Sequence, residues 1–531
     1  MLTLGDILRI HAQQIREKPA IHFEGRVYSF CDWNLFTNRL IHGLLHLGVT
    51  QSDRVCFVGN NCPEIFFFYS GAEKGAYIAV PINPSLSARE IESIVEEVEP
   101  RVVFVRKDAN FELKKLIDCL ENKENIKKIY IIEEELSSVT LSSNGKVEVM
   151  TGWFDDEDGG EPPLQPVEED AILYLFFTSG STGKPKGVML SHKSQVLDVQ
   201  KRLIECPLTR SSVGMTVMPM YHLGGKSSAN KFLYRGCTNV LIRKFEANAF
   251  AENVAGFQVN TVLLAPVMIK RILDEISEGE ASKLSTLQDI EYSSGPIHPL
   301  VLEKAIRFFG PVLTQFYGLT ESGPSGCVLS KQDHRTGTKS EPNSKIRSCG
   351  LPSVGLEVRV VDEHFERVSP NQIGEIVIKS DSIMNGYWRN DIETKAVLRD
   401  GWLFSGDLAT VDEEGYIYLR GRKKEMIVSG GENISPREVE DVIMEHPWVK
   451  DAAVFGLPDE VWGEKVCVAI VLNQEVIHSK ENEAIDARIR SFMEDKIAKF
   501  KIPKQYYFVE DLPKNTYGKI NRQELVRKYR E

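Results

Sequence analysis

Three observations predict an α/β fold, in which a large region of mainly parallel sheets precedes a smaller C-terminal domain. The chain has 531 residues, 42% of them hydrophobic, which is too long for one compact core and enough for two domains. Short apolar runs alternate with helical patterns over the first two thirds of the chain, as is typical of buried parallel strands joined by helices. Near Leu356 the pattern changes to short strands separated by turn residues.

The strand–helix–strand unit is clearest early in the chain. "RVCFV" at 54–58 predicts a strand, and the stretch after it contains a helix that begins with a capping box of Ser87 and Glu90. "RVVFV" at 101–105 predicts the next strand, and the unit recurs near Val262 and again before "VLTQFYG". Ligands of such sheets bind beyond the carboxyl ends of the strands.

Two stretches depart from this alternation. Residues 153–170 are acidic and rich in glycine and proline, which predicts a solvated loop before the next strand. From Leu356 the runs "LEVRVVD", "GEIVIKS" and "GYIYLRG" predict a small antiparallel, barrel-like unit. Beyond it the chain has its own helix and strand pattern, including a helix start at Ser435 with proline next. We therefore predict an N-terminal domain of residues 1–421 and a small mobile α+β C-terminal domain of residues 422–531.

Charge and composition narrow the functional classes. A formal net charge of -12 and a pI near 5.6 argue against a nucleic-acid-binding protein, which needs clustered lysine and arginine. The nine cysteines are scattered without a C-x-x-C pair, which predicts reduced thiols used mainly in packing. The first residues show no secretory signal, and no window resembles a membrane-spanning helix. We expect a cytoplasmic protein that acts on a small molecule.

The most informative stretch is "TSGSTGKPKG" at 178–187, which directly follows the apolar run "AILYLFF". Its glycines let the backbone approach a phosphate, and its hydroxyls and lysines supply donors and positive charge. The spacing is not that of a Walker loop, because Gly180 and Gly183 are only three residues apart and Pro185 follows Lys184. A solvated connector with the same composition is the alternative interpretation.

The ordered string resembles the phosphate-loop signature of the adenylate-forming superfamily, which includes acyl-CoA synthetases, peptide-synthetase adenylation domains and luciferases. Further motifs follow in the order of that family and extend over nearly the whole chain. The resemblance implies ATP and Mg²⁺ as ligands, and it implies a catalytic role at the phosphates for Lys186. Nucleotide-binding roles are implied for Thr178, Ser179, Gly180, Ser181, Thr182, Gly183 and Lys184.

The motif "QFYGLTE" at 315–321 is the second part of the resemblance. It implies that Tyr317 stacks on adenine, Thr320 contacts the α-phosphate and Glu321 helps to hold Mg²⁺. A nucleotide polyphosphate needs a divalent ion bound through oxygen ligands, which suits these assignments. Upstream, the chain has Gly-Pro-Ile where the family more often has Gly-Gly-Ala-Pro along the adenine. The remaining implied nucleotide contacts are Gln315, Gly318, Gly295, Pro296 and Ile297.

Two motifs near the domain boundary imply contacts to the ribose and to coenzyme A. Asp407 in "GWLFSGDLA" matches a carboxylate that accepts hydrogen bonds from both ribose hydroxyls, and Arg422 matches a second ribose contact. Lys424 matches the hinge about which the C-terminal domain rotates. In acyl-CoA synthetases the segment "SGGENI" lines the pantetheine channel, which implies this role for Gly430, Gly431 and Glu432. A plain Gly-Gly turn before a helix is the alternative for the two glycines.

The last motifs concern the acid. Lys519 in "LPKNTYGKINR" matches the catalytic lysine that bridges the acid carboxylate and the α-phosphate, although Tyr517 replaces the usual Ser or Thr. His222 in "PMYHLGGKSSANK" matches a gate beside the acid. Lys226 has two interpretations, pairing with a second carboxylate of the acid or extending to solvent. The residues assigned to the acyl pocket are His222, Gly224, Gly225 and Lys226.

These motifs predict that a carboxylic acid and ATP form an acyl-adenylate and that coenzyme A then receives the acyl group. "SGGENI" favours coenzyme A over the first alternative, an enzyme that loads a carrier protein or another acceptor. A luciferase-like oxidation is a second alternative. A catalytically silent ligand-binding protein is the third, and the joint presence of Lys186, Glu321, Asp407, Arg422 and Lys519 argues against it.

Overall fold

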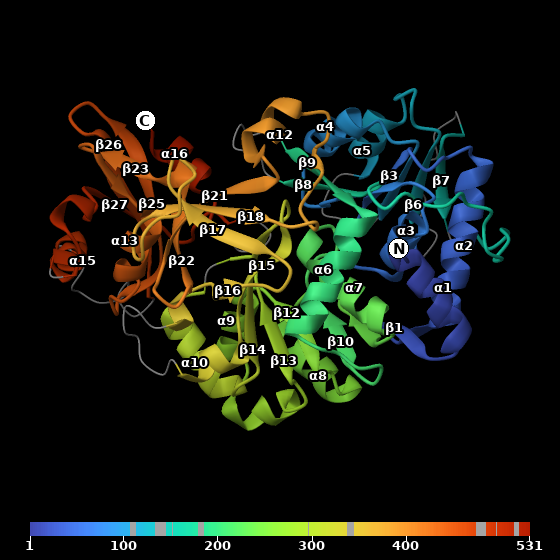
Figure 1. The fold of residues 1–531 in the computed structure, drawn as a ribbon, viewed down its shortest axis with the longest axis horizontal. Coiled ribbons are helices and arrows are strands. Elements are labelled where there is room, and N and C mark those ends of the chain that lie inside the picture. The colour runs from blue at the N-terminus through green and yellow to red at the C-terminus, as the bar shows by residue number, and fades with distance from the viewer. Residues whose placement is uncertain are drawn as a thin grey trace.

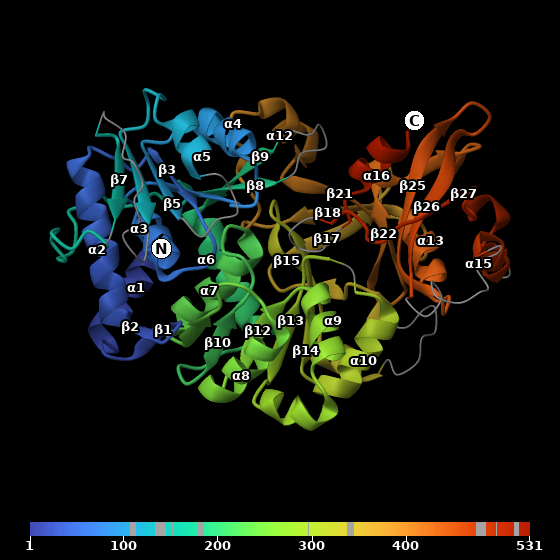
Figure 2. The ribbon, with the colours of Figure 1, turned by 180° about the vertical axis from the view of Figure 1, so that it is seen from behind.

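The computed structural model arranges the chain as two large sheets with flanking helices and two smaller sheets beside them (Figures 1 and 2). This arrangement confirms the predicted fold class. It describes residues 1–106, 113–132, 145–150, 152–178, 185–295, 297–336, 345–473, 485–494, 496–514 and 520–530.

The first large sheet has eight strands in the order β19-β9-β8-β4-β3-β5-β6-β7, and the run from β8 to β7 is parallel. Its strands are β3 (Arg54–Val58), β4 (Ile78–Ile82), β5 (Val102–Arg106), β6 (Lys128–Ile132), β7 (Val147–Met150), β8 (Ile172–Thr178), β9 (Lys186–Ser191) and β19 (Gly386–Tyr387). The helices around it are α2 (Phe30–His46), α3 (Pro63–Glu73), α4 (Ala88–Val98) and α5 (Leu113–Leu120). Four or five consecutive apolar residues per central strand explain why both faces of this sheet are covered.

The second large sheet has nine strands in the order β16-β15-β14-β13-β12-β10-β11-β1-β2, parallel from β1 to β14. Its strands are β1 (Pro19–Phe23), β2 (Arg26–Ser29), β10 (Val213–Thr216), β11 (Thr238–Leu241), β12 (Thr261–Leu264), β13 (Asp289–Tyr292), β14 (Leu313–Leu319), β15 (Gly323–Leu329) and β16 (Leu351–Pro352). Its helices are α1 (Leu4–Gln14), α6 (His192–Glu205), α7 (Leu223–Arg235), α8 (Ala247–Phe257), α9 (Pro266–Glu275), α10 (Pro299–Phe309) and α11 (Lys331–Thr336).

Two smaller five-stranded sheets follow, coloured from gold to red in Figure 1. One contains β17 (Glu357–Val361), β18 (Gly374–Lys379), β20 (Leu398–Arg399), β21 (Trp402–Val411) and β22 (Ile417–Arg422), with α12 (Asp391–Val397) beside it. The other contains β23 (Ile427–Ser429), β24 (Glu432–Ile434), β25 (Val449–Asp459), β26 (Gly463–Leu472) and β27 (Gln505–Phe508). Its helices are α13 (Pro436–Ile443), α15 (Ile485–Glu494) and α16 (Arg522–Tyr529). Because β22 and β23 belong to different sheets, we propose that the domains divide at residue 422.

Several local predictions agree with the structure. β3 has the predicted bounds, and the Ser87 side chain caps α4 while Glu90 bonds back to the Ser87 backbone. Residues 152–170 contain no helix or strand, but they are not wholly solvated, because the Trp153 ring packs on Phe67 and Phe104 in the core. All nine cysteines are free thiols and seven are buried, which confirms their packing role. In the described part of the chain, no helix has both the length and the apolar composition that crossing a membrane requires.

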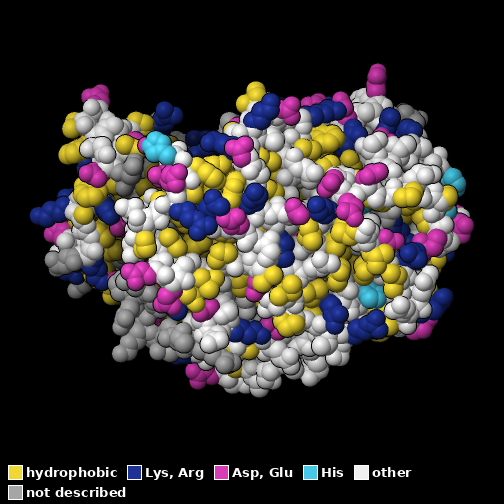
Figure 3. Space-filling model, in the orientation of Figure 1, with side chains coloured by type: hydrophobic (Ala, Val, Ile, Leu, Met, Phe, Trp, Pro, Cys, Tyr) yellow, Lys and Arg dark blue, Asp and Glu magenta, His cyan; other side chains and the backbone are white. Residues whose placement is uncertain are grey.

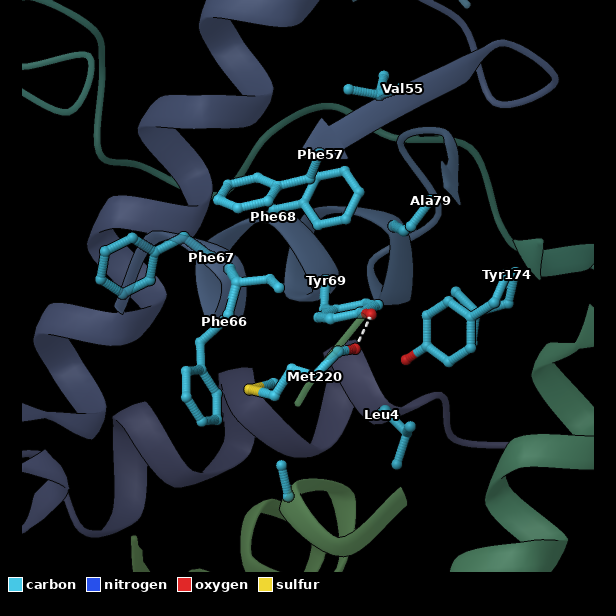
Figure 4. Packing of buried hydrophobic residues seen from close by; sticks show 14 of the residues in the cluster. Leu4, Val55, Phe57, Phe66, Phe67, Phe68, Tyr69, Ala79, Tyr174 and Met220 are labelled. Atoms are coloured by element: carbon cyan, nitrogen blue, oxygen red, sulfur yellow. Dashed lines mark hydrogen bonds between the residues drawn. The ribbon is translucent and has the colours of Figure 1, made fainter. Parts of the chain in front are cut away.

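A buried ion pair connects the two large sheets. Lys226 Nζ of α7 lies 2.7 Å from Glu73 Oε1 of α3, and the two side chains are 1% and 0% exposed. Tyr174 of β8 and Ser70 also donate hydrogen bonds to the Glu73 carboxylate. Figure 4 shows the neighbouring contact, in which the Tyr69 hydroxyl donates to the Met220 carbonyl oxygen. The interpretation of Lys226 as a solvent-facing lysine was therefore wrong, because its ammonium already has a carboxylate partner inside the core.

We predict that Lys226→Met lowers the free energy of unfolding by about 3–5 kcal/mol, because it leaves the Glu73 carboxylate buried without its cation. Denaturant unfolding followed by circular dichroism measures this loss. The double variant Glu73→Gln/Lys226→Met should recover a large part of it, since neither buried charge remains. A double variant no more stable than Lys226→Met would contradict the view that the unpaired Glu73 charge causes the loss of stability.

Candidate active site

The predicted nucleotide residues of β14 lie at the carboxyl end of the second parallel sheet. β14 ends at Leu319, and a turn containing Thr320 and Glu321 connects it to β15. A side chain at Gly318 would place its Cβ 2.6 Å from the Gly323 carbonyl oxygen. The glycine therefore permits the close approach of β14 and β15 that forms this turn.

Three residues predicted from separate motifs meet at one carboxylate. The Tyr317 hydroxyl donates to Asp407 Oδ2 at 2.7 Å, and Arg422 Nε lies 2.7 Å from Asp407 Oδ1. The antiparallel pairing of β21 with β22 sets Asp407 directly opposite Arg422. Burial and the neighbouring Asp407 raise the pKa of Tyr317 well above its usual value. The Asp407 carboxylate is thus held in a fixed orientation by a neutral donor and a cation.

The two residues assigned to the phosphates and the metal ion are held by side chains that the sequence did not single out. Lys186 Nζ lies 2.6 Å from Glu393 Oε2, and the Tyr387 hydroxyl donates to Glu321 Oε1 at 2.9 Å. The hydrogen bond from Lys186 lowers the pKa of Glu393, and the charge of Lys424 acts in the same direction. The sequence contains one relevant signal, because Asn390 caps α12 by accepting from the Glu393 backbone N–H. The cap shows where α12 begins. It does not show that Glu393 pairs with Lys186, which lies 207 residues away in the sequence.

The structure places three further nucleotide candidates, Gln315, Gly295 and Ile297, near β13. Gln315 accepts a hydrogen bond from the Tyr292 hydroxyl at 3.2 Å, so its side chain contacts the neighbouring strand. Gly295 has open space where a Cβ would lie, and Ile297 is buried. Ser294 just before them has a φ of 76°, an unfavourable backbone conformation for a residue other than glycine. The chain turns sharply here, at the end of β13.

The acyl-pocket candidates lie at the start of α7. His222 is the residue before the first helical turn, and burial lowers its pKa well below the usual value, which keeps the imidazole neutral. A Cβ at Gly224 would lie 3.8 Å from the Ser294 hydroxyl, so this end of α7 adjoins the turn after β13. At Gly225 a Cβ would meet the Pro219 carbonyl oxygen at 2.4 Å. Lys226, the next residue, belongs to the buried ion pair with Glu73.

The segment assigned to coenzyme A forms a tight hairpin. Gly430 and Gly431 have φ values of 62° and 84° and connect β23 to β24, where Glu432 pairs with Ser429. A Cβ at Gly430 would approach the Trp462 ring to 2.8 Å. Trp462 is 47% exposed. On the face of the molecule that Figure 3 shows, charged side chains of both signs are interspersed with hydrophobic ones. The backbone of Gly430 and Gly431 therefore forms a turn, as the alternative interpretation predicted. Contact of this segment with coenzyme A stays a prediction.

Some predicted residues fall outside the described part of the chain. The flanks of both loops are described: Thr178 pairs with Lys186 across β8 and β9, and Lys514 forms an isolated bridge with Ile520. Both loops therefore begin and end at adjacent backbone positions. The residues outside the description are Ser179, Gly180, Ser181, Thr182, Gly183, Lys184, Pro296 and Lys519.

The donor set fits a magnesium ion that is shared with a nucleotide. Mg²⁺ typically takes one or two protein carboxylates and completes its shell with phosphate oxygens and water. Glu321 would supply one carboxylate to such an ion, and the Tyr387 hydroxyl donates a hydrogen bond to that carboxylate. Over the residues that the structure describes, no cluster of three or more His, Cys, Asp or Glu side chains could hold a metal by itself.

Two models of known protein families match the chain. The family model of AMP-binding enzymes matches residues 8–388, and the model of their C-terminal domain matches residues 438–519. The chain belongs to the AMP-binding enzyme family. This membership confirms the resemblance that the sequence motifs indicated.

Similar proteins cover nearly the whole chain. A fatty acid–[acyl-carrier-protein] ligase of Streptomyces coeruleorubidus is 29% identical over 98% of this chain and 96% of its own length. A feruloyl-CoA synthase of Amycolatopsis sp. is 30% identical over 96% of both chains. The solved structure of an anthranilate CoA ligase in complex with anthranoyl-AMP has a TM-score of 0.85 at 24% identity, covering 98% of this chain and 96% of that one. The last comparison establishes the shared fold.

We predict that Asp407→Asn weakens ATP binding about 10- to 100-fold, because the ribose hydroxyls lose a charged acceptor and Arg422 loses its carboxylate. Calorimetric titration with a non-hydrolysable ATP analogue measures the change. Asp400→Asn, an exposed turn position just before β21, is the matched control and should bind as the unaltered protein does. Equal affinities for the two variants would remove Asp407 from the nucleotide site.

Proposed function

We propose that this protein is an AMP-forming acid–thiol ligase that converts a carboxylic acid and coenzyme A into an acyl-CoA thioester at the expense of ATP. The observation that carries the proposal is the Asp407 carboxylate held between Tyr317 and Arg422 in a chain of the AMP-binding enzyme family. The relatives named as feruloyl-CoA synthase and indoleacetate–CoA ligase support coenzyme A as the acceptor. The nine free thiols support a cytoplasmic location.

In the first half-reaction an oxygen of the acid carboxylate attacks the α-phosphorus of ATP, and pyrophosphate leaves. Two anions must approach each other, so cations at the phosphates lower the barrier. In this proposal Lys186, Thr320 and Lys519 contact the phosphate oxygens, and Glu321 holds Mg²⁺. The bound ion neutralises phosphate charge. The product is an acyl-adenylate whose ribose is held by Asp407 and Arg422.

In the second half-reaction the coenzyme A thiolate attacks the acyl carbonyl, and AMP leaves with the bonding electrons. The C-terminal domain, residues 422–531, rotates about Lys424 between the two steps, which removes Lys519 and brings in the hairpin of Gly430 and Gly431. Lys424 is exposed. The side chain of its neighbour Lys423 is also exposed, and its Nζ lies 3.0 Å from Glu375 Oε2. Such solvated charges can exchange partners at small cost, which suits a hinge.

The acid is proposed to lie beside His222 and Gly224 at the start of α7. A carrier protein is a second candidate acceptor, favoured by the relative named as a fatty acid–[acyl-carrier-protein] ligase. The acceptor is distinguished by the product that forms from an acid, ATP and each thiol.

We predict that Lys519→Ala reduces acid-dependent pyrophosphate release at least about 100-fold, because the attacking carboxylate loses its cation. The same variant should still form acyl-CoA from synthetic acyl-adenylate, since Lys519 is withdrawn in that step. Pyrophosphate-release and thioester assays measure the two half-reactions separately. Equal loss of both would contradict the domain rotation.

We expect at least one acid in a panel of short, medium and long fatty acids, aromatic acids and dicarboxylates to yield acyl-CoA, AMP and pyrophosphate. Mass spectrometry of the products with and without coenzyme A identifies the thioester. An acid that yields adenylate and pyrophosphate but no acyl-CoA would move the proposal to the carrier-protein acceptor. Absence of pyrophosphate release with every acid would support a ligand-binding protein.

A further inference from the structure

One short segment connects the phosphate and metal elements of the proposed site. Lys186 begins β9 in the first large sheet, whereas Glu321 follows β14 in the second. Residues 386–397, which comprise β19 and α12, contact both. Tyr387 of β19 donates its hydroxyl to Glu321, and Glu393 of α12 forms the ion pair with Lys186.

The backbone of this segment is fixed to both neighbours. β19 pairs antiparallel with β9, the strand that begins with Lys186. The Met384 N–H, just before β19, donates to the Glu321 carbonyl oxygen at 2.8 Å. The Tyr387 N–H donates to the Thr394 hydroxyl at 2.8 Å, which ties β19 to α12. The side chains of Tyr387 and Glu393 are therefore placed by main-chain hydrogen bonds and not only by their polar partners.

The contact between Lys186 and Glu393 is suited to exchange. The two side chains are 12% and 28% exposed, and they lie in a surface hollow that Trp388 and Arg389 also line. Lys186 Nζ is also 5.1 Å from the centre of the Tyr387 ring, a second favourable contact for the ammonium besides the carboxylate. A partly solvated pair contributes little stability, so a phosphate oxygen with higher charge can replace the carboxylate.

We propose that Glu393 competes with the nucleotide phosphates for Lys186 and that Tyr387 is a positioning residue for the metal-binding carboxylate of Glu321. Glu393 holds the Lys186 ammonium in the nucleotide-free protein and competes with the incoming phosphates for it. Tyr387 fixes the orientation of the Glu321 carboxylate through the hydrogen bond to Oε1. This inference rests on the proposed function, because that function assigns the phosphates to Lys186 and the ion to Glu321.

Glu393→Gln tests the competition. With a chelator present, the variant should bind the ATP analogue that has a methylene between its α- and β-phosphates about two- to fivefold more tightly than the unaltered protein, because the competing charge is gone. Asp391→Asn, an exposed carboxylate in the same first turn of α12, should bind unchanged. Weaker or unchanged binding by Glu393→Gln would overturn the competition. If the ion pair only supported the structure, losing the Glu393 charge would leave Lys186 less well placed and would not tighten binding.

Tyr387→Phe tests the orientation of Glu321. Its metal-free affinity for the same analogue should be unchanged, while the gain in affinity on adding Mg²⁺ should fall about three- to tenfold. Tyr418→Phe is the matched control, because the Tyr418 hydroxyl donates to a different carboxylate, that of Asp412. An unchanged magnesium effect, or an equal loss with and without magnesium, would overturn the role of Tyr387.

The binding measurements separate this inference from the proposed function. If the unaltered protein binds the analogue but releases no pyrophosphate with any acid, the proposed function fails while both binding tests stay decisive. If the unaltered protein does not bind the analogue at all, both proposals are overturned. Thermal unfolding of each variant confirms that the comparison is between folded proteins.

Discussion

The ion pair between Lys226 and Glu73 constrains how the two large sheets lie against each other. Removing two charges from water costs several kcal/mol each, and this cost is offset only when the partners meet with further hydrogen bonds. Glu73 of α3 receives donors from Lys226, Tyr174 and Ser70, so α3 and α7 keep one relative position. α7 also carries His222 and Gly224, and the placement of the proposed acid site relative to the first sheet depends on this pair.

A second buried cluster holds α6 and α7 against β13. Glu291 of β13 pairs with Arg202 of α6 and Lys231 of α7, all nearly inaccessible to solvent. Burial alone would raise the pKa of Glu291, but the two cations hold it below its usual value. Because β13 leads into the turn at Ser294 and Gly295, these charges also fix the proposed adenine segment. The framework of the site is thus held together by paired charges inside the protein.

The contacts that we propose to change during the reaction are partly exposed to solvent, unlike these buried ion pairs. The pairs of Lys423 with Glu375 and of Lys186 with Glu393 are partly solvated, and such pairs form and break at small cost. A two-step reaction at one site needs a fixed nucleotide pocket and exchangeable contacts around it.

The sequence by itself determined the α/β class, the bounds of β3, the cap of α4 and the residues Tyr317, Asp407 and Arg422, because periodicity and ordered motifs are local properties of a chain. The tertiary structure alone decided which distant side chains meet. It paired Lys226 with Glu73, where the sequence suggested a substrate or solvent, and it brought Glu393 to Lys186 over 207 residues. A charged residue carries no sequence mark of its burial or partner, since both depend on how helices pack in three dimensions.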